Sequence, residues 1–193
     1  MQVIGLTGGI GSGKSTVARV FETFGIKIYN SDERAKTMYF IPKIKAEIEK
    51  LLGKEAYINQ NTLNKKFIGE KIFSDSELLK QVNHIIHTAV KADFEVFCAE
   101  NSSEKYIIKE SALLIEANLL TSVDKLIVVT SPLLQRKKRI AMRDNLNETE
   151  INKRINQQFA DEEKVKYAHW VLKNDESELL IPQIMAIHEE LQK

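Results

Sequence analysis

A glycine-rich run near the start of the chain carries the most specific chemistry in this sequence. Residues 8–16 read GGIGSGKST and satisfy the pattern G-x-x-x-x-G-K-[ST], which binds the phosphates of nucleotides. The glycines allow successive backbone N–H groups to converge on phosphate oxygens at a helix N-terminus. Lys14 would reach the β- and γ-phosphates, and the Ser15 hydroxyl would ligate Mg²⁺. The sequence therefore predicts a nucleoside triphosphate site formed by Gly11, Ser12, Gly13, Lys14, Ser15 and Thr16.

The residues on either side of this loop predict the two elements that it requires. Residues 3–7 are a short, mainly apolar run bounded by glycines, as expected for a buried strand. After the loop, apolar residues recur at helical spacing as far as Gly25, which is a typical helix end. Strand, loop and helix thus follow one another in the order that phosphate binding needs.

Two acidic residues follow predicted strands at the edge of the sheet where such a loop lies. Asp32 comes shortly after the apolar run 26–29, and Glu110 ends the run 106–109. Ligands of open parallel sheets bind beyond the carboxyl ends of the strands. We therefore expect Asp32 to act as a general base and Glu110 to be a partner of Mg²⁺. The alternatives are that Ser31 or Asp32 only caps a helix starting near Glu33, and that Glu110 is an ordinary acid at a strand edge.

A polar helical stretch over residues 132–167 concentrates basic side chains. Nine of them occur here: Arg136, Lys137, Lys138, Arg139, Arg143, Lys153, Arg154, Lys164 and Lys166. Arg139 and Arg143 are four residues apart on one helical face, so they are the best candidates for phosphate contacts from a mobile cover. Most of the other basic residues fit equally well a solvated helix face that neighbouring acids balance.

The remaining pattern predicts an α/β protein with a P-loop NTPase-type parallel sheet of five strands and helices on both faces. The five apolar runs are residues 2–7, 26–29, 106–109, 125–130 and 170–172. No convincing strand lies between the second and third runs, so residues 31–104 are predicted to be a helical substrate-binding insert. The core would comprise residues 1–30, 105–135 and 168–193, and residues 136–167 would be the lid region.

Composition and charge narrow the class of protein further. The chain has 193 residues, a formal net charge of +1 and a single cysteine, Cys98. The small net charge gives no reason to expect nucleic acid or a membrane as partner, and the single cysteine excludes an internal disulfide. The cytoplasm is therefore the default compartment. The motifs N-K-x-D and D-x-x-G of GTPase switches do not occur, which favours a small-molecule kinase.

From Ile4 to about Asn174 the chain resembles the dephospho-coenzyme A kinase family. The shared motifs are T-G-G-I-G-S-G-K-S-T at 7–16, Gly25-Ile26, Lys71-Ile72-Phe73, Ile86-His87, Leu113-Leu114-Ile115-Glu116, Arg139 through Arg143-Asp144, Gln158 and Asn174. The resemblance implies a nucleotide-binding sheet, a helical coenzyme-binding region and a lid. It further implies ATP, Mg²⁺ and dephospho-coenzyme A, with phosphate transfer to the 3′-hydroxyl of the coenzyme and a monomer or weak homo-oligomer.

The resemblance also suggests roles for individual residues. It implies that Asp32, Lys14 and Arg139 are catalytic, and that His87 joins Asp32 and Arg139 in binding substrate. From the residues alone, His84 and His87 reach substrate or simply face solvent. The sequence departs from the family pattern at several positions: Asn30 stands for an acid, Ala112 and Thr88 for prolines, and His169 for an aspartate.

Two other functions are compatible with the loop. One is a kinase of the same fold that acts on a nucleoside or nucleotide. The other is a nucleotide-dependent binding or regulatory protein with slow hydrolysis, which the basic stretch and the missing switch motifs disfavour.

Overall fold

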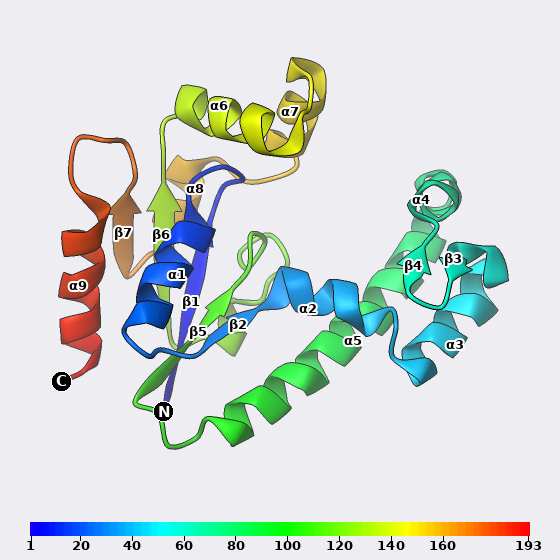
Figure 1. Ribbon diagram of the computed structural model, residues 1–193, viewed down its shortest axis with the longest axis horizontal. Helices are drawn as coiled ribbons and strands as arrows, with labels where there is room; N and C mark the ends of the chain where they lie inside the picture. The colour runs from blue at the N-terminus through cyan, green and yellow to red at the C-terminus, as the bar shows by residue number, and fades with distance from the viewer. The chain divides into compact units, whose positions relative to one another are not determined.

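The computed structural model describes residues 1–193, and the chain divides into two compact units (Figure 1). The first unit comprises Met1–Asn30 and Asn101–Lys193, and the second comprises Ser31–Glu100. The chain therefore leaves the first unit after its second strand and returns to it before its third. None of the helices is both long enough and apolar enough to cross a membrane.

The first unit is built on a parallel sheet, as predicted. Its five strands have the order β2-β5-β1-β6-β7, and all neighbouring strands are parallel. They are β1 (Gln2–Gly8), β2 (Ile28–Asn30), β5 (Tyr106–Glu110), β6 (Lys125–Thr130) and β7 (Trp170–Lys173). The predicted α/β class with a five-stranded parallel sheet is confirmed. Because all strands point the same way, their carboxyl ends gather at one edge.

Four strands end one residue later than predicted, and the largest error is the start of the second strand. The run 26–29 was expected to be the second strand, but β2 begins at Ile28. The Ile26 N–H instead donates to the Phe21 carbonyl at 3.2 Å, across a turn in which Gly25 has a φ of +84°. Ile26 is thus buried because it packs at the C-terminal end of α1 (Lys14–Thr23), not because it pairs with a neighbouring strand.

Alternate residues of β6 contribute to two separate cores. Ile127 and Val129 belong to a cluster that includes residues of α1 (Lys14–Thr23) and α9 (Leu180–Leu191). Leu126 and Val128 belong to a smaller cluster with residues of the segment after β5, which contains the 3₁₀ helix η2 (Leu120–Ser122). Successive side chains of a strand point to opposite faces, so both faces of the sheet are covered.

After β6 the chain forms three further helices, α6 (Leu133–Asp144), α7 (Glu148–Ile155) and α8 (Asp161–Val165). We call α6 and α7 the lid helices. Asn145 ends α6 in the left-handed conformation with a φ of +52°, and Asn147 and Glu150 form a capping box at the start of α7. These local signals explain the sharp break between the lid helices.

The second unit is mostly helical and has its own core. Its elements are α2 (Ser31–Met38), α3 (Pro42–Leu52), the 3₁₀ helix η1 (Lys54–Ala56), β3 (Tyr57–Asn59), β4 (Thr62–Leu63), α4 (Lys65–Ser74) and α5 (Ser76–Glu100). Ile48, Leu52 and Val82 are among its buried residues. The Tyr57 hydroxyl donates to the Tyr39 carbonyl at 2.8 Å, and burial is the main cause that raises the pKa of Tyr57 to about 12.

The small hairpin of β3 and β4 corrects the expectation of a purely helical insert. These two strands are antiparallel and are joined across the polar residues 59–61. The Asn61 N–H donates to the side-chain oxygen of Asn59 at 2.9 Å, a local bond that favours a turn. Strands of three and two residues leave too little alternation for a pattern-based prediction.

Candidate active site

The glycine-rich loop joins β1 to α1, as its sequence predicted. Gly13 caps α1 in a left-handed conformation with a φ of +98°, and Lys14 is the first helical residue. Gly9 leaves room for a neighbouring side chain, because a Cβ atom there would lie 2.0 Å from the Arg136 guanidinium. The loop backbone at Gly9 therefore packs directly against the Arg136 side chain before the chain reaches the N-terminus of α1.

Side chains from elsewhere in the first unit hold the peptides of this loop. The carbonyl oxygens of residues 10–12 each accept a hydrogen bond from a side chain outside the loop. The donors are, in order, Arg136 Nε at 3.0 Å, Arg139 Nη1 at 3.3 Å and Asn174 Nδ2 at 2.8 Å. A trans peptide directs its C=O and the following N–H to opposite sides. The N–H groups of Gly11 and Gly13 therefore point away from these donors, as an anion-binding loop requires.

Lys14 and Ser12 supply the polar interior of the loop. Lys14 is largely buried, and its Nζ donates to the Gly8 carbonyl at 2.9 Å and lies 3.5 Å from that of Gly9. The Ser12 hydroxyl is fully buried and has no hydrogen-bond partner in the protein. A positive charge and an unsatisfied hydroxyl are thus present where a phosphate would be bound.

The residues at this edge of the sheet fit Mg²⁺ better than a transition metal. No group of three or more His, Cys, Asp or Glu side chains is placed to hold an ion. Ser15 is exposed at the second position of α1, and Glu110 ends β5 opposite Leu6 of β1. Mg²⁺ in kinases is bound by few protein oxygens together with substrate phosphates. The predicted ligands Ser15 and Glu110 have the right chemistry for such a site.

Asn30 lies directly beside Glu110 on the neighbouring strand. Its Nδ2 donates to Glu110 Oε2 at 2.7 Å, and the Glu110 side chain is buried. An aspartate at position 30, as in the family pattern, would place two acids together here. The amide instead donates a hydrogen bond to the carboxylate, so the two side chains attract each other where two acids would repel.

The two arginines predicted to contact phosphate lie in different surroundings. Arg139 contacts the loop at Gly11 and also donates to Ser131 Oγ at 3.0 Å. Arg143 is exposed and donates two hydrogen bonds to Asp144, at 2.7 and 2.9 Å, which raise the pKa of Arg143. The structure brings Arg139 to the loop and does not bring Arg143 there. Four-residue spacing places both arginines on one face of α6. Only Arg139, which is one turn closer to the start of α6, reaches the loop.

The interpretation of most basic residues in 132–167 as a solvated face holds for Lys138, Lys153, Arg154 and Lys166, which are exposed, whereas Arg136 and Lys164 are exceptions. Arg136 and Lys164 are buried, and Gln158 Oε1 accepts the N–H of Ile10 in the loop at 2.7 Å. One signal identifies Arg136: it precedes the buried Ile140 by four residues, so the two share a helical face. Gln158 was indicated only by the family resemblance, and Lys164 carries no local signal.

Asp32 and His87 belong to the second unit. Asp32 is the second residue of α2 and follows the end of β2 by two residues. The interpretation of Ser31 or Asp32 as a cap before a helix starting near Glu33 is wrong, because α2 begins at Ser31. His84 and His87 are exposed on α5. Their roles toward substrate stay predictions.

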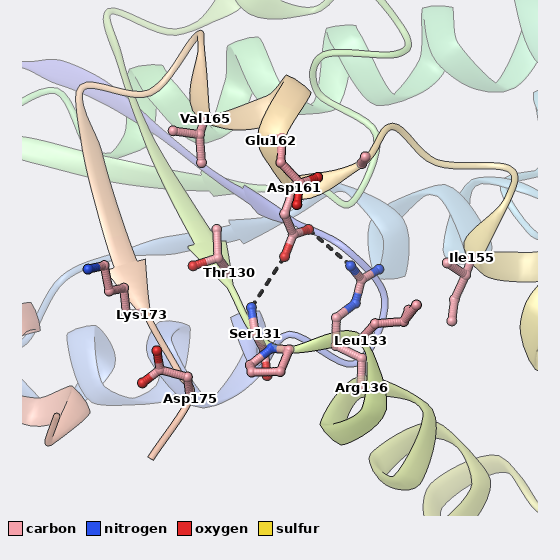
Figure 2. A pocket seen from close by; sticks show the side chains of 12 residues that line it. Thr130, Ser131, Leu133, Arg136, Ile155, Asp161, Glu162, Val165, Lys173 and Asp175 are labelled. Atoms are coloured by element: carbon pink, nitrogen blue, oxygen red, sulfur yellow. Dashed lines mark hydrogen bonds and ion pairs between the residues drawn. The ribbon is translucent and has the colours of Figure 1, made fainter. Parts of the chain in front are cut away.

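A cavity lies at the carboxyl ends of β6 and β7, and it is linked to the loop through Arg136, which lines the cavity and bonds to the Ile10 carbonyl. This cavity has a volume of about 750 Å³ and is lined by residues that include Thr130, Arg136, Asp161 and Lys173 (Figure 2). Parallel sheet, phosphate loop with its lysine, and basic lid helices together define a P-loop kinase.

The chain belongs to the dephospho-CoA kinase family. The family model described as "Dephospho-CoA kinase" matches residues 2–179. A dephospho-CoA kinase of Bacteroides fragilis is 40% identical over 185 residues, which cover 95% of this chain and 90% of that protein. The membership makes this chain an ATP-using kinase of the final step of coenzyme A biosynthesis.

Solved structures agree with this fold. A structure from Thermus thermophilus has a TM-score of 0.81 and 29% identity, and the match covers 99% of this chain and 96% of that one. The dephospho-CoA kinase from Campylobacter jejuni has a TM-score of 0.67 and 24% identity, with coverage of 98% and 97%. The second likeness concerns the fold alone.

Proposed function

We propose that this chain transfers the γ-phosphate of ATP to the 3′-hydroxyl of dephospho-coenzyme A, with Mg²⁺ as the metal. The observation that carries this proposal is the phosphate loop, in which side chains bind three consecutive carbonyl oxygens while Lys14 lies over the loop. Family membership supplies the acceptor. The partners are then two small molecules, and the enzyme acts as a monomer or weak homo-oligomer.

Each side chain has a part in this proposal. Backbone N–H groups of the loop bind the β- and γ-phosphates, and Lys14 and Arg139 neutralise charge on the group being transferred. Ser15 and Glu110 would hold Mg²⁺, which supplies further neutralisation of the phosphate oxygens when bound. Asp32 takes the proton of the acceptor hydroxyl, and His87 contacts the acceptor.

The acceptor requirement tests the proposed function directly. ADP is expected to form rapidly only when dephospho-coenzyme A, ATP and Mg²⁺ are all present, because the hydroxyl must be positioned against the γ-phosphate. A coupled assay of ADP release would compare dephospho-coenzyme A with AMP, nucleosides and water. Equal rates with water or AMP would exclude the assignment, and a faster rate with a nucleoside would favour the alternative kinase.

Arg139→Ala is expected to lower turnover more than it weakens binding of ATP. The guanidinium contacts the Gly11 carbonyl of the loop and Ser131 Oγ just after β6, so its charge lies beside the loop that binds the phosphoryl group to be transferred. Losing it should lower turnover roughly 10- to 100-fold, with a smaller change in the dissociation constant of ATP. Steady-state kinetics and calorimetry with ATP separate the two effects.

Lys138→Ala is the matched control for this variant. Lys138 is the preceding residue of α6 and is exposed, so its loss removes the same charge from the same helix. It should leave turnover close to that of the wild type. If Arg139→Ala weakened ATP binding but left turnover unchanged, the prediction would be wrong. Arg139 would then stabilise bound ATP without stabilising the transition state further.

A further inference from the structure

One residue of the phosphate loop, Ile10, is held through both of its backbone polar groups from the two ends of the lid helices. The Ile10 carbonyl accepts from Arg136 in the first turn of α6, and the Ile10 N–H donates to Gln158, three residues after the end of α7. The two distances are 3.0 and 2.7 Å. The start and the end of the lid helices therefore meet at the same residue of the loop.

The Arg136 side of this contact is fixed by a buried ion pair. Arg136 Nη1 lies 3.0 Å from Asp161 Oδ1, with side-chain exposures of 6% and 16%. The second oxygen of Asp161 accepts the Ser131 N–H at 3.3 Å, so the carboxylate bridges α6 and the end of β6 (Figure 2). Breaking a buried pair leaves an uncompensated charge. Arg136 thus has little freedom to leave the loop.

The Gln158 side is fixed through the residue that follows it. The Phe159 N–H donates to Glu116 Oε1 at 2.9 Å, and the same oxygen lies 2.6 Å from Lys164 Nζ. Lys164 is fully buried and also donates to the Ala112 carbonyl at 3.2 Å. The backbone next to Gln158 is therefore anchored to the segment after β5. This anchoring fixes the position from which the Gln158 side chain reaches the Ile10 N–H.

We infer that Gln158 is a positioning residue that holds the phosphate loop in the conformation that binds nucleotide. Gln158 accepts the N–H of Ile10, whereas Arg136, Arg139 and Asn174 hold carbonyl oxygens of residues 10–12. Without this acceptor the loop would lose one restraint. The free energy needed to order the loop would then weaken the affinity for nucleotide. The inference rests on the proposed role of the loop in binding the phosphates of ATP.

Gln158→Met tests this role because methionine has a similar length and lacks the amide. The KM for ATP and the dissociation constant of ADP are expected to rise about 10-fold, the loss of one hydrogen bond. Turnover at saturating ATP and the KM for dephospho-coenzyme A should change less than about threefold, since the restraint acts equally on ground and transition states. Steady-state kinetics, calorimetry with ADP and thermal melting give these values.

Two further variants make the result specific. Gln157→Met is the matched control, because Gln157 is the exposed preceding residue and should tolerate the change. Gln158→Asn keeps the amide but is one methylene too short, so it should weaken ADP binding as Gln158→Met does. Unchanged ADP affinity in folded Gln158 variants would overturn the inference. So would equal rises in both KM values with a lowered melting temperature, which indicate a general structural role.

The binding measurement separates this inference from the proposed function. ADP affinity is measured without any acceptor. If the wild type failed to phosphorylate dephospho-coenzyme A while Gln158→Met still weakened ADP binding, the proposed acceptor would be wrong and the role of Gln158 would stand.

Discussion

Lys14→Ala should lower turnover by about 10²–10³-fold, because stabilisation of a transferring phosphoryl group is mainly electrostatic. Lys14 begins α1 and its Nζ lies against the carbonyls of Gly8 and Gly9, so its charge is centred on the loop. Burial of the side chain leaves few solvent molecules to screen it, which strengthens its interaction with phosphate. Turnover with saturating ATP and dephospho-coenzyme A checks the expected loss.

Arg19→Ala is the control for this variant. Arg19 lies on the exposed side of α1, so its removal takes one positive charge from the same helix without touching the loop. Thermal melting must accompany the kinetics, since Lys14 also bonds to the loop carbonyls. A folded Lys14→Ala enzyme with more than about a tenth of wild-type turnover would contradict the role of Lys14.

Local pattern was enough to predict the sheet and the loop. Four of the five strands start at the predicted residue, because buried parallel strands are continuous apolar runs bounded by turn residues. The start of the second strand was predicted wrongly for a related reason. Ile26 is apolar and buried, but its N–H bonds to Phe21 at the end of α1. The hairpin of β3 and β4 was missed because strands of two and three residues carry almost no periodicity.

The side chains that organise the loop were harder to predict, since their partners are distant in sequence. Arg136 bonds to a residue 126 positions away and Gln158 to one 148 positions away. Lys164 stands in a polar, charged stretch and is nevertheless fully buried, because Glu116 and the Ala112 carbonyl satisfy it. Arg143 satisfied the same spacing rule as Arg139 and instead pairs with its neighbour Asp144. Helical spacing predicts which residues share a face of the helix, but it does not predict which part of that face contacts the loop.

Asp32→Asn should abolish most turnover while ATP binding and the fold persist. A ribose hydroxyl is a poor nucleophile, and a positioned base typically contributes about 10²–10⁴ in rate. Asparagine keeps the shape of aspartate, but its amide does not accept a proton at neutral pH. Asn30, two residues earlier, cannot replace it for the same reason and is already bonded to Glu110. Turnover, ATP affinity and melting temperature would be measured on the same preparation.

Glu33→Gln is a close control for Asp32→Asn. Both residues lie in the first turn of α2, where a negative charge favours the helix, so each variant loses the same small stabilisation. Glu33 also pairs with Lys36 at 2.6 Å, but both side chains are exposed and such a pair contributes little. Near-normal turnover of Asp32→Asn would leave Asp32 without a chemical role, and a melting temperature lowered well below that of Glu33→Gln would make it structural. Lost turnover with normal melting and ATP binding supports the base, because Glu33→Gln removes a carboxylate from the same helical turn at a position with no proposed role in the transfer.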